Sequence, residues 1–239
     1  MNSKFKTNNS KPPFVFVNMA ITADGKIATA NRVLHSFGSK KDLQHLYELR
    51  ATADAILCGA RTVEISEATL GNGGEKFGKL RLKNGLAEYP TRVIVSGSGS
   101  IHPASKIFQK RFSPIIILTT KRASAKKLAQ LRAIADEVKI FGDTEVNLRA
   151  ALRWLGKSFG VKRLLCEGGG ELNDALFRAD LVGEINLTFC PKIFGGRTAP
   201  TIADGKGFST LALTRNFKLA SARDFKGELF TVFLRAKNG

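Results

Sequence analysis

The sequence has few of the residues that build crosslinked or metal-centred sites. Only three cysteines and three histidines occur among its 239 residues. An odd number of cysteines without close pairs argues against a disulfide framework, and none of these residues has metal-ligand spacing. Each cysteine lies within or at the end of an apolar run (Cys58, Cys166 and Cys190). We therefore expect buried, reduced thiols and no metal site.

Long hydrophobic runs are also missing. No stretch reaches the roughly 18 uninterrupted apolar residues that a membrane helix needs. Residues 1–10 are polar and lack the apolar segment of a secretory signal. We expect residues 1–12 to be a disordered lead-in, and we expect a cytoplasmic protein without a membrane partner. The composition, 43% hydrophobic and 24% charged, is typical of a soluble globular domain.

Acidic residues are scarce relative to basic ones. The chain has 38 Lys and Arg against 20 Asp and Glu, so 38 − 20 gives a net charge of +18. This excess is compatible with nucleic-acid binding, with an enzyme of phosphorylated small molecules, or with a solvated basic surface. One basic cluster stands out, on the exposed face of a predicted helix: Lys121, Arg122, Lys126, Lys127 and Arg132. No zinc motif or RNA-binding aromatic motif accompanies it, so nucleic acid is an unlikely partner.

Apolar runs alternate with stretches of helical periodicity from residue 13 onward. The patterns predict strands over residues 14–21, 55–58, 92–95, 114–119, 137–141, 161–166 and 184–190, and helices over 40–52, 123–135, 147–158 and 171–179. Such alternation builds a parallel sheet with helices on its faces. Two further stretches, 217–224 and 228–235, alternate with period two around a Lys-Gly turn and predict an antiparallel hairpin. The fold class is thus α/β, with a mixed sheet flanked by helices and a C-terminal hairpin, in one domain over residues 13–237.

Residues 66–90 are the least regular part of the domain. The segment Gly71-Asn-Gly-Gly74 and several lysines interrupt any periodicity. This pattern predicts a long surface loop, which would lie over a site.

The strongest local feature is the segment Leu165-Cys-Glu-Gly-Gly-Gly-Glu-Leu172. A buried strand ends at Glu167, and three glycines lead into a helix. Glycines let a ligand approach the backbone closely, and free N–H groups at a helix start attract phosphate. Ligands of open α/β sheets bind at the carboxyl ends of strands. The alternative is a tight strand-to-helix turn with a solvated Glu167.

Three more segments place glycine and polar residues after strands. They are residues 19–26, which include Asp24 and Lys26, residues 58–62, and residues 191–196 with 204–208 after them. Each segment alone is typical of an ordinary turn. Their recurrence at strand ends predicts one shared crevice.

The order of these motifs resembles a known family. Residues 19–28, 49–63, 167–173 with 181–182, and 191–196 together resemble the reductase domain of riboflavin biosynthesis. This domain is the C-terminal half of the bacterial bifunctional deaminase–reductase and the stand-alone reductase of archaea and fungi. The resemblance covers residues 13 to 235. The zinc-binding deaminase half has no counterpart in this sequence.

The resemblance implies a dihydrofolate-reductase-like fold, NADPH as cofactor and a homodimer. It implies an oxidoreductase that reduces the ribose of a 5-amino-6-(5-phosphoribosylamino)pyrimidine to ribityl, with the hydride going to C1′. By motif, Lys26, Glu167 and Asp24 would be catalytic, and Arg50, Leu70 and Glu167 would contact the substrate. Cofactor contacts would come from Ala20, Gly59, Thr62, Ser96, Gly97, Gly168, Gly169, Gly170, Glu171, Leu172 and Asn173.

Departures from the family pattern concentrate in residues 64–73. An acidic residue of the family is Ser66 here, a proline is Ala68 and an arginine is Gly73. Elsewhere, a tryptophan is Ser36 and an aspartate is Gly183. A site built for such polar groups discriminates through them. The alternatives are therefore a related reductase of another pterin-like or phosphorylated substrate, or a non-catalytic protein that binds a nucleotide or nucleic acid.

Overall fold

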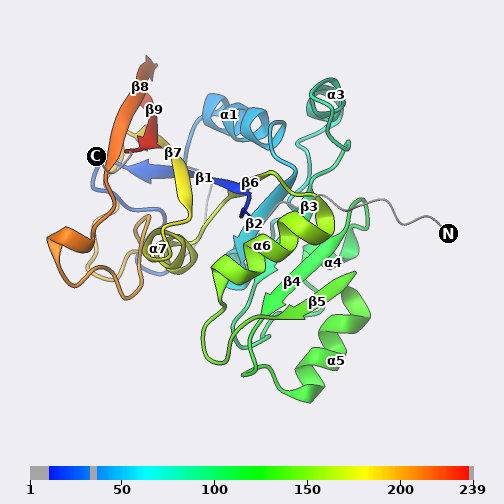
Figure 1. Ribbon diagram of the computed structural model, residues 1–239. Helices are drawn as coiled ribbons and strands as arrows, with labels where there is room; N and C mark the ends of the chain where they lie inside the picture. Colours follow the sequence, from blue (N-terminus) through cyan, green and yellow to red (C-terminus); the bar gives the residue numbers. More distant parts are fainter. Residues whose placement is uncertain (1–10, 33–36, 237–239) are drawn as a thin grey trace.

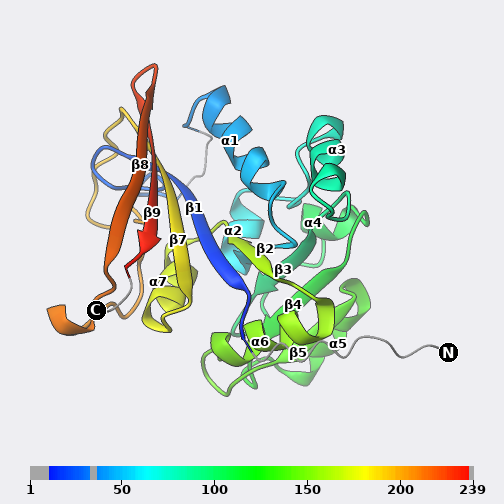
Figure 2. The same ribbon diagram turned by 45° about the horizontal axis from the view of Figure 1, so that its top comes forward.

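The structure is a computed structural model that describes residues 11–32 and 37–236 (Figures 1 and 2). One nine-stranded sheet runs through it in the order β5-β4-β3-β2-β6-β1-β7-β9-β8. Its strands are β1 (Phe14–Thr22), β2 (Ala55–Gly59), β3 (Thr91–Val95), β4 (Ile115–Thr119), β5 (Glu137–Ile140), β6 (Arg163–Cys166), β7 (Val182–Cys190), β8 (Phe217–Phe225) and β9 (Glu228–Arg235). The helices are α1 (Lys40–Arg50), α2 (Ala60–Ile65), α3 (Glu75–Lys83), α4 (Lys106–Gln109), α5 (Ala125–Ile134), α6 (Leu148–Phe159) and α7 (Gly170–Arg178), with a 3-10 turn at Leu211–Leu213.

The sheet is mixed, as the sequence predicts. Strands β1 to β7 pair in parallel, whereas β9 pairs antiparallel with both β7 and β8. Figure 2 shows β8 and β9 as a long hairpin at one side of the molecule. The predicted C-terminal antiparallel hairpin is therefore confirmed.

Apolar side chains cover both faces of the parallel part of the sheet. On one face, Val15 and Val17 of β1 pack with Leu152 of α6 and Leu176 of α7. On the other face, residues of β2 to β4 pack with α2, α4 and α5, and Phe16 packs with the leucines of α1. Side chains alternate between faces along a strand, so the continuous apolar runs reflect burial on both sides. All three cysteines are buried and unpaired, as predicted.

The prediction of a loop over residues 66–90 is wrong for its middle part. Helix α3 occupies residues 75–83 and buries Phe77 and Arg81, which lie one turn apart. Gly74 begins the helix with a φ of 108°, a conformation that glycine adopts readily. The glycines and lysines obscured this periodicity. Arg81 adds stability by donating to the carbonyls of Ala53 (2.8 Å) and Ala87 (2.8 Å).

The carboxyl ends of seven strands lie on the same side of the molecule. Because β1 to β7 run in the same direction, the loops that follow them all leave the sheet at these carboxyl ends. These loops include the glycine segments that the sequence singled out. No helix of the described residues is long and apolar enough to cross a bilayer.

Candidate active site

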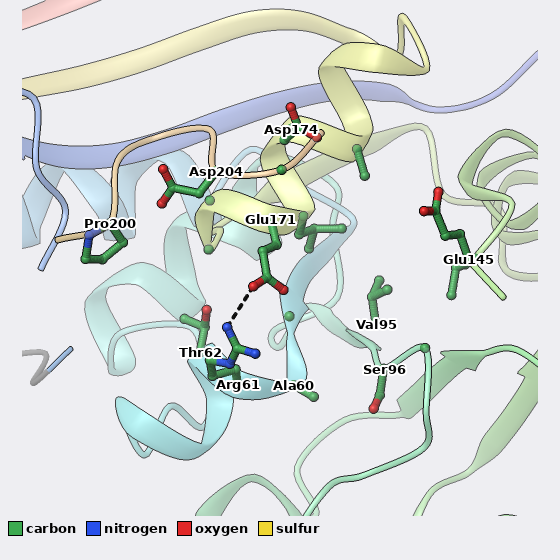
Figure 3. A pocket seen from close by; sticks show the side chains of 18 of the residues that line it. Ala60, Arg61, Thr62, Val95, Ser96, Glu145, Glu171, Asp174, Pro200 and Asp204 are labelled. Atoms are coloured by element: carbon green, nitrogen blue, oxygen red, sulfur yellow. Dashed lines mark hydrogen bonds and ion pairs between the residues drawn. The ribbon is translucent and has the colours of Figure 1, made fainter. Parts of the chain in front are cut away.

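A cavity of about 750 Å³ lies where the loops after β2, β3, β5 and β6 meet (Figure 3). Eight of the predicted cofactor residues line it: Gly59, Thr62, Ser96, Gly97, Gly169, Gly170, Glu171 and Leu172. The loop with Asp204, Gly205 and Lys206 closes one side. Three of the four glycine-bearing strand ends thus contribute to one crevice. Its volume suits a small-molecule ligand or cofactor.

The three glycines at residues 168–170, called the glycine turn below, are required by close packing within the protein. A Cβ on Gly168 would lie 2.9 Å from the Met19 sulfur, and one on Gly169 would lie 3.0 Å from the Thr62 hydroxyl. A Cβ on Gly170 would lie 2.6 Å from the carbonyl oxygen of Thr201. At Gly168 and Gly169 the contact is with the end of a side chain, whereas at Gly170 it is with backbone. Gly170 is therefore the position where an added side chain would have to displace the neighbouring chain.

Helix α7 begins at the cavity wall. Its N-cap is Gly169, and no side chain caps it. The N–H groups of Leu172 and Asn173 donate to the Gly169 carbonyl, whereas those of Gly170 and Glu171 have no partner among the described residues. The N-terminal end of a helix carries a partial positive charge, which favours an anion. Residues 169–172 line the cavity, so this wall is suited to a pyrophosphate group.

Two aspartates hold the covering loop against this helix. Asp204 accepts from the Thr201 N–H (2.7 Å) and its hydroxyl (2.7 Å). Asp174 accepts from the N–H groups of Lys206 (3.1 Å) and Gly207 (3.1 Å). The Thr201 bonds order the loop itself, whereas the Asp174 bonds and the Asp204 N–H, which donates to the Gly170 carbonyl (3.1 Å), hold it over the start of α7. Figure 3 shows both aspartates above the cavity.

An exposed ion pair spans the cavity. Arg61 of α2 donates to Glu171 of α7 across 2.8 Å, and the two side chains are 60% and 67% exposed. Figure 3 draws this contact as a dashed line between the two walls. Because both partners are solvated, the pair can open at little cost.

A second pair lies on the other side of the glycine turn. Arg50 of α1 binds both carboxylate oxygens of Glu167 at 2.7 Å, and a third guanidinium bond goes to the Gly71 carbonyl (2.7 Å). The side chains are only 10% and 11% exposed. Burial disfavours the charged arginine, but the Glu167 carboxylate outweighs this effect and raises the pKa of Arg50. Two of the three predicted substrate residues, Arg50 and Glu167, thus form one buried unit.

Asp24 and Lys26, the predicted catalytic residues that follow β1, form hydrogen bonds mainly with backbone groups. Asp24 accepts from the Thr22 hydroxyl (2.5 Å) and from the N–H groups of Phe194 (3.2 Å) and Gly195 (2.8 Å). The Thr22 hydroxyl foremost, with these two N–H groups, lowers the pKa of Asp24. Lys26 donates to the carbonyl of Ala199 (3.3 Å). Ile27 and Ala28, which follow Lys26, line the cavity.

The predicted catalytic and substrate residues Asp24, Lys26, Arg50 and Glu167 do not line the cavity, and neither do four more predicted site residues. Asn173 is buried behind its wall, where it donates to the Ile202 carbonyl (2.9 Å). Leu70 is 1% exposed and belongs to the apolar core. Gly168 accepts from the Gly59 N–H (2.9 Å), and Ala20 lies beside Thr188 in the sheet. Ser36 lies outside the described residues. The predicted roles of these residues stay predictions.

Sequence reasoning missed one wall of the cavity. Thr144, Glu145 and Val146, in the loop between β5 and α6, line it. This loop also follows a parallel strand and contains Gly142, so the strand-end rule could have found it. Arg61 was missed as well, although it stands next to the predicted Thr62.

The sequence matches the family model described as the RibD C-terminal domain over residues 13–230. Two relatives bear the name 2,5-diamino-6-ribosylamino-4(3H)-pyrimidinone 5′-phosphate reductase. The one from Archaeoglobus fulgidus is 34% identical over 196 residues, covering 82% of this chain and 88% of the relative. The one from Methanothermobacter thermautotrophicus is 34% identical over 200 residues, covering 84% and 88%.

Solved structures share the fold. A pyrimidine reductase-like protein from Corynebacterium diphtheriae superposes with a TM-score of 0.82 at 20% identity, covering 95% of this chain and 93% of that one. The riboflavin biosynthesis reductase Rib7 of yeast gives a TM-score of 0.69 at 19% identity, covering 97% and 93%. The likeness to these structures concerns the fold, whereas the family model and the 34% identical relatives show that the chain belongs to the RibD C-terminal domain family.

Proposed function

We propose that the chain is an NADPH-dependent oxidoreductase that reduces the ribosyl group of a ribosylaminopyrimidine 5′-phosphate to ribityl. The observation that carries this proposal is the 34% identity, over most of both chains, to reductases named for 2,5-diamino-6-ribosylamino-4(3H)-pyrimidinone 5′-phosphate. The cavity supports it independently, since it offers what a dinucleotide requires. A glycine-lined wall and an uncapped helix start lie together at its centre.

The chain's residues fit a bound dinucleotide. The pyrophosphate would rest on the N–H groups at the start of α7, beside Thr62, and the nicotinamide end would lie toward Ile27 and Pro200. The adenosine end would lie toward the loop after β3. When bound, the cofactor supplies a hydride to C1′ of the substrate.

Glu167 and Lys26 would have different roles in this arrangement. Glu167 is held in a bidentate ion pair with Arg50, so its carboxylate is fixed in place, and the pair as a unit would orient the substrate near the opened sugar. Lys26 has only one long bond to a backbone carbonyl. Its ammonium group can donate the proton that the substrate nitrogen or oxygen takes up as the hydride reaches C1′. Asp24 holds the turn that positions Lys26.

A turnover assay tests the proposal. Purified protein with NADPH and the ribosylaminopyrimidine phosphate should oxidise the cofactor and yield a product that gains two hydrogens by mass spectrometry. Lys26→Met should lower kcat by roughly 100-fold, the size expected for loss of a general acid. Tight NADPH binding without turnover of the aminated or the deaminated pyrimidine would favour a related reductase with another substrate.

The sheet edge supports a homodimer as part of the proposal. Strand β8 ends the strand order and is largely exposed along its length, with Leu219 57% and Phe225 42% exposed. A long exposed edge strand is a ready template for pairing with another chain. Light scattering should give twice the mass of one chain, and a single-chain mass would contradict the dimer. Three free, buried cysteines favour a cytoplasmic location.

A further inference from the structure

Helix α3 packs against the C-terminal end of α1, the helix that carries Arg50 (Figures 1 and 2). It belongs to residues 71–88, named here the α3 segment. The Phe77 ring of α3 lies 5.2 Å from the Tyr47 ring of α1, centroid to centroid. Gly73 lies against the same ring, and a Cβ there would meet it at 2.4 Å. The family pattern has an arginine at this position, so a cation is replaced here by close packing against α1.

Two side chains of the α3 segment bond the main-chain carbonyls at the end of α1. Most carbonyls in the last turn of a helix have no partner within the helix. Arg81 donates to the carbonyl of Arg50 and, at 2.8 Å, to that of Ala53. Asn84, the C-cap of α3, donates to the carbonyl of Ala51 at 2.9 Å. The end of α1 is thus fixed against α3 by three bonds.

The burial of Arg81 makes this contact a rigid one. Arg81 is 1% exposed and forms no ion pair with any residue that the structure describes. Its third bond goes from Nε to the carbonyl of Ala87 (2.8 Å). Burial lowers the pKa of Arg81 to about 10, so the guanidinium stays charged at neutral pH. A charged donor forms stronger hydrogen bonds than a neutral one, so Arg81 fixes the two segments that it joins.

The α3 segment also reaches the guanidinium of Arg50. Arg50 donates to the Gly71 carbonyl at 2.7 Å, besides its two bonds to the buried carboxylate. Asn72, which follows Gly71, is buried and donates to the Glu88 carbonyl (3.1 Å), which ties the start of the segment to its end. The segment therefore holds Arg50 at its backbone through Arg81 and at its side chain through Gly71.

We propose that Arg81, supported by Asn84, is a positioning residue for the reduction, which acts through Arg50 by fixing the end of α1. The proposal rests on the proposed function, because that function assigns Arg50 and Glu167 to the substrate. A shift of the last turn of α1 would break the bidentate contact of Arg50 with Glu167, whose two bonds are both 2.7 Å long. A displacement of about 1 Å in an orienting group can lower the rate about 100-fold.

Arg92 provides a matched control for Arg81. It is fully buried as well, and it donates to the carbonyls of Ile107, Lys110 and Ser113. Burial lowers its pKa to about 10, as for Arg81. Arg92 lies at the start of β3, at the opposite end of the strand from the cavity. Arg81→Lys and Arg92→Lys each remove a buried guanidinium fork, and each should lower Tm by about 5 °C.

Steady-state kinetics well below both Tm values separate positioning from stability. Arg81→Lys should lower kcat/KM for the ribosylaminopyrimidine phosphate by about 10-fold or more and leave the Kd of NADPH within about 2-fold. Arg92→Lys should leave both quantities within about 2-fold. In an Arg50→Lys background, Arg81→Lys should cost at most about 2-fold more, because Arg81 acts through Arg50. Equal kinetic losses in Arg81→Lys and Arg92→Lys, or additive losses in the double variant, would overturn the proposal.

Asn84→Ala keeps the proposal testable if Arg81→Lys does not fold. Asn84 is exposed, so this change leaves the core intact. It should lower the same kcat/KM by about 3-fold through loss of one bond to α1. Lys83→Ala is its control, since Lys83 is the adjacent exposed residue. An Asn84→Ala enzyme as active as Lys83→Ala would count against positioning by α3 and overturn the proposal.

Nitrogen-15 NMR distinguishes a failure of this proposal from a failure of the proposed function, because it needs no turnover. The Arg50 Nε–H, bonded to Glu167, should exchange slowly with water. Arg81→Lys should raise this exchange rate at least about 10-fold, whereas Arg92→Lys should not. Unchanged exchange in Arg81→Lys overturns the positioning role. Faster exchange in a protein that does not reduce the substrate would overturn the reductase assignment and leave the control of Arg50 by α3 standing.

Discussion

Glu167 and Glu171 stand on either side of the same three glycines, and each pairs with an arginine. The pair of Glu167 and Arg50 is bidentate, at 2.7 Å, and about one-tenth exposed. The pair of Glu171 and Arg61 has one bond of 2.8 Å and is about two-thirds exposed. The first pair closes a packed region under α1, whereas the second spans an open cavity. Glu167 and Glu171 are only four residues apart, yet the first belongs to a buried ion pair and the second to a solvent-exposed pair at the cavity.

The difference indicates how the two sides take their ligands. The open side has its volume, helix start and donors in place, so a cofactor can enter without rearranging the core. On the closed side, every Glu167 oxygen already accepts from Arg50. A substrate must approach this pair as a unit, because removing one partner would strand the other in a desolvated site.

The largest expected effect concerns the thiol of Cys166, which lies next to the buried pair of Glu167 and Arg50. Burial raises the pKa of Cys166, which immediately precedes Glu167, to about 12. At pH 8 its thiolate fraction is then about 10⁻⁴, against roughly a quarter for a free thiol. Its reaction with a disulfide reagent in the native protein should be at least ~1,000-fold slower than in the denatured protein. Mass spectrometry of Cys166 checks this, and fast native modification would show that the closed side opens.

The next effect is the loss of the buried pair. Glu167→Gln leaves the Arg50 guanidinium buried without its counter-charge, so the free energy of unfolding should fall by about 3 kcal/mol. Turnover should fall as well, because the pair that would orient the substrate is lost. Denaturant unfolding measures the first effect. Glu171→Gln is the matched control and should change stability by less than about 0.5 kcal/mol, since both partners are exposed.

A third, smaller effect comes from the glycine turn between the two pairs. Gly170→Ala would place a Cβ 2.6 Å from the Thr201 carbonyl, which should cost about 1–3 kcal/mol of stability through overpacking. The shifted loop should weaken nucleotide binding as well. Gly59→Ala is the control, because its Cβ would lie 3.7 Å from the nearest atom, the Gly168 carbonyl oxygen. Equal losses in the two variants would argue against tight packing as the reason for glycine.

The same contrast shows what the sequence could and could not predict. The strand that ends at Glu167 and the helix that follows the glycines were predictable, because burial and periodicity are local properties of the chain. The convergence of the loops was also predictable, since the carboxyl ends of parallel strands lie at the same end of the sheet. The glycines were predicted as ligand-facing, and the structure adds that a Cβ at each of them would meet Met19, Thr62 or Thr201. Such contacts depend on packing between distant segments.

The partners of the charged residues were the least predictable part. Arg50 and Glu167 are 117 positions apart, so no periodicity links them, and only the family resemblance placed both near the substrate. Asp24 has the sequence environment of an ordinary turn, and the structure gives it turn-stabilising bonds to Phe194 and Gly195. Helix α3 was missed because its buried residues include Arg81, a residue type that is almost never fully buried.

The smallest expected effect concerns the exposed pair of Arg61 and Glu171. It tests whether this pair contributes little to stability and to cofactor binding. Arg61→Ala should change the free energy of unfolding by less than about 0.5 kcal/mol, because a solvated ion pair gains little over its hydrated partners. It should alter NADPH affinity by less than about 3-fold if Arg61 only spans the cavity mouth. Calorimetry at low and high salt checks this. A loss of 10-fold or more that shrinks with salt would mean that Arg61 leaves Glu171 to bind a phosphate, so the exposed pair would rearrange on binding, unlike the buried pair of Glu167 and Arg50.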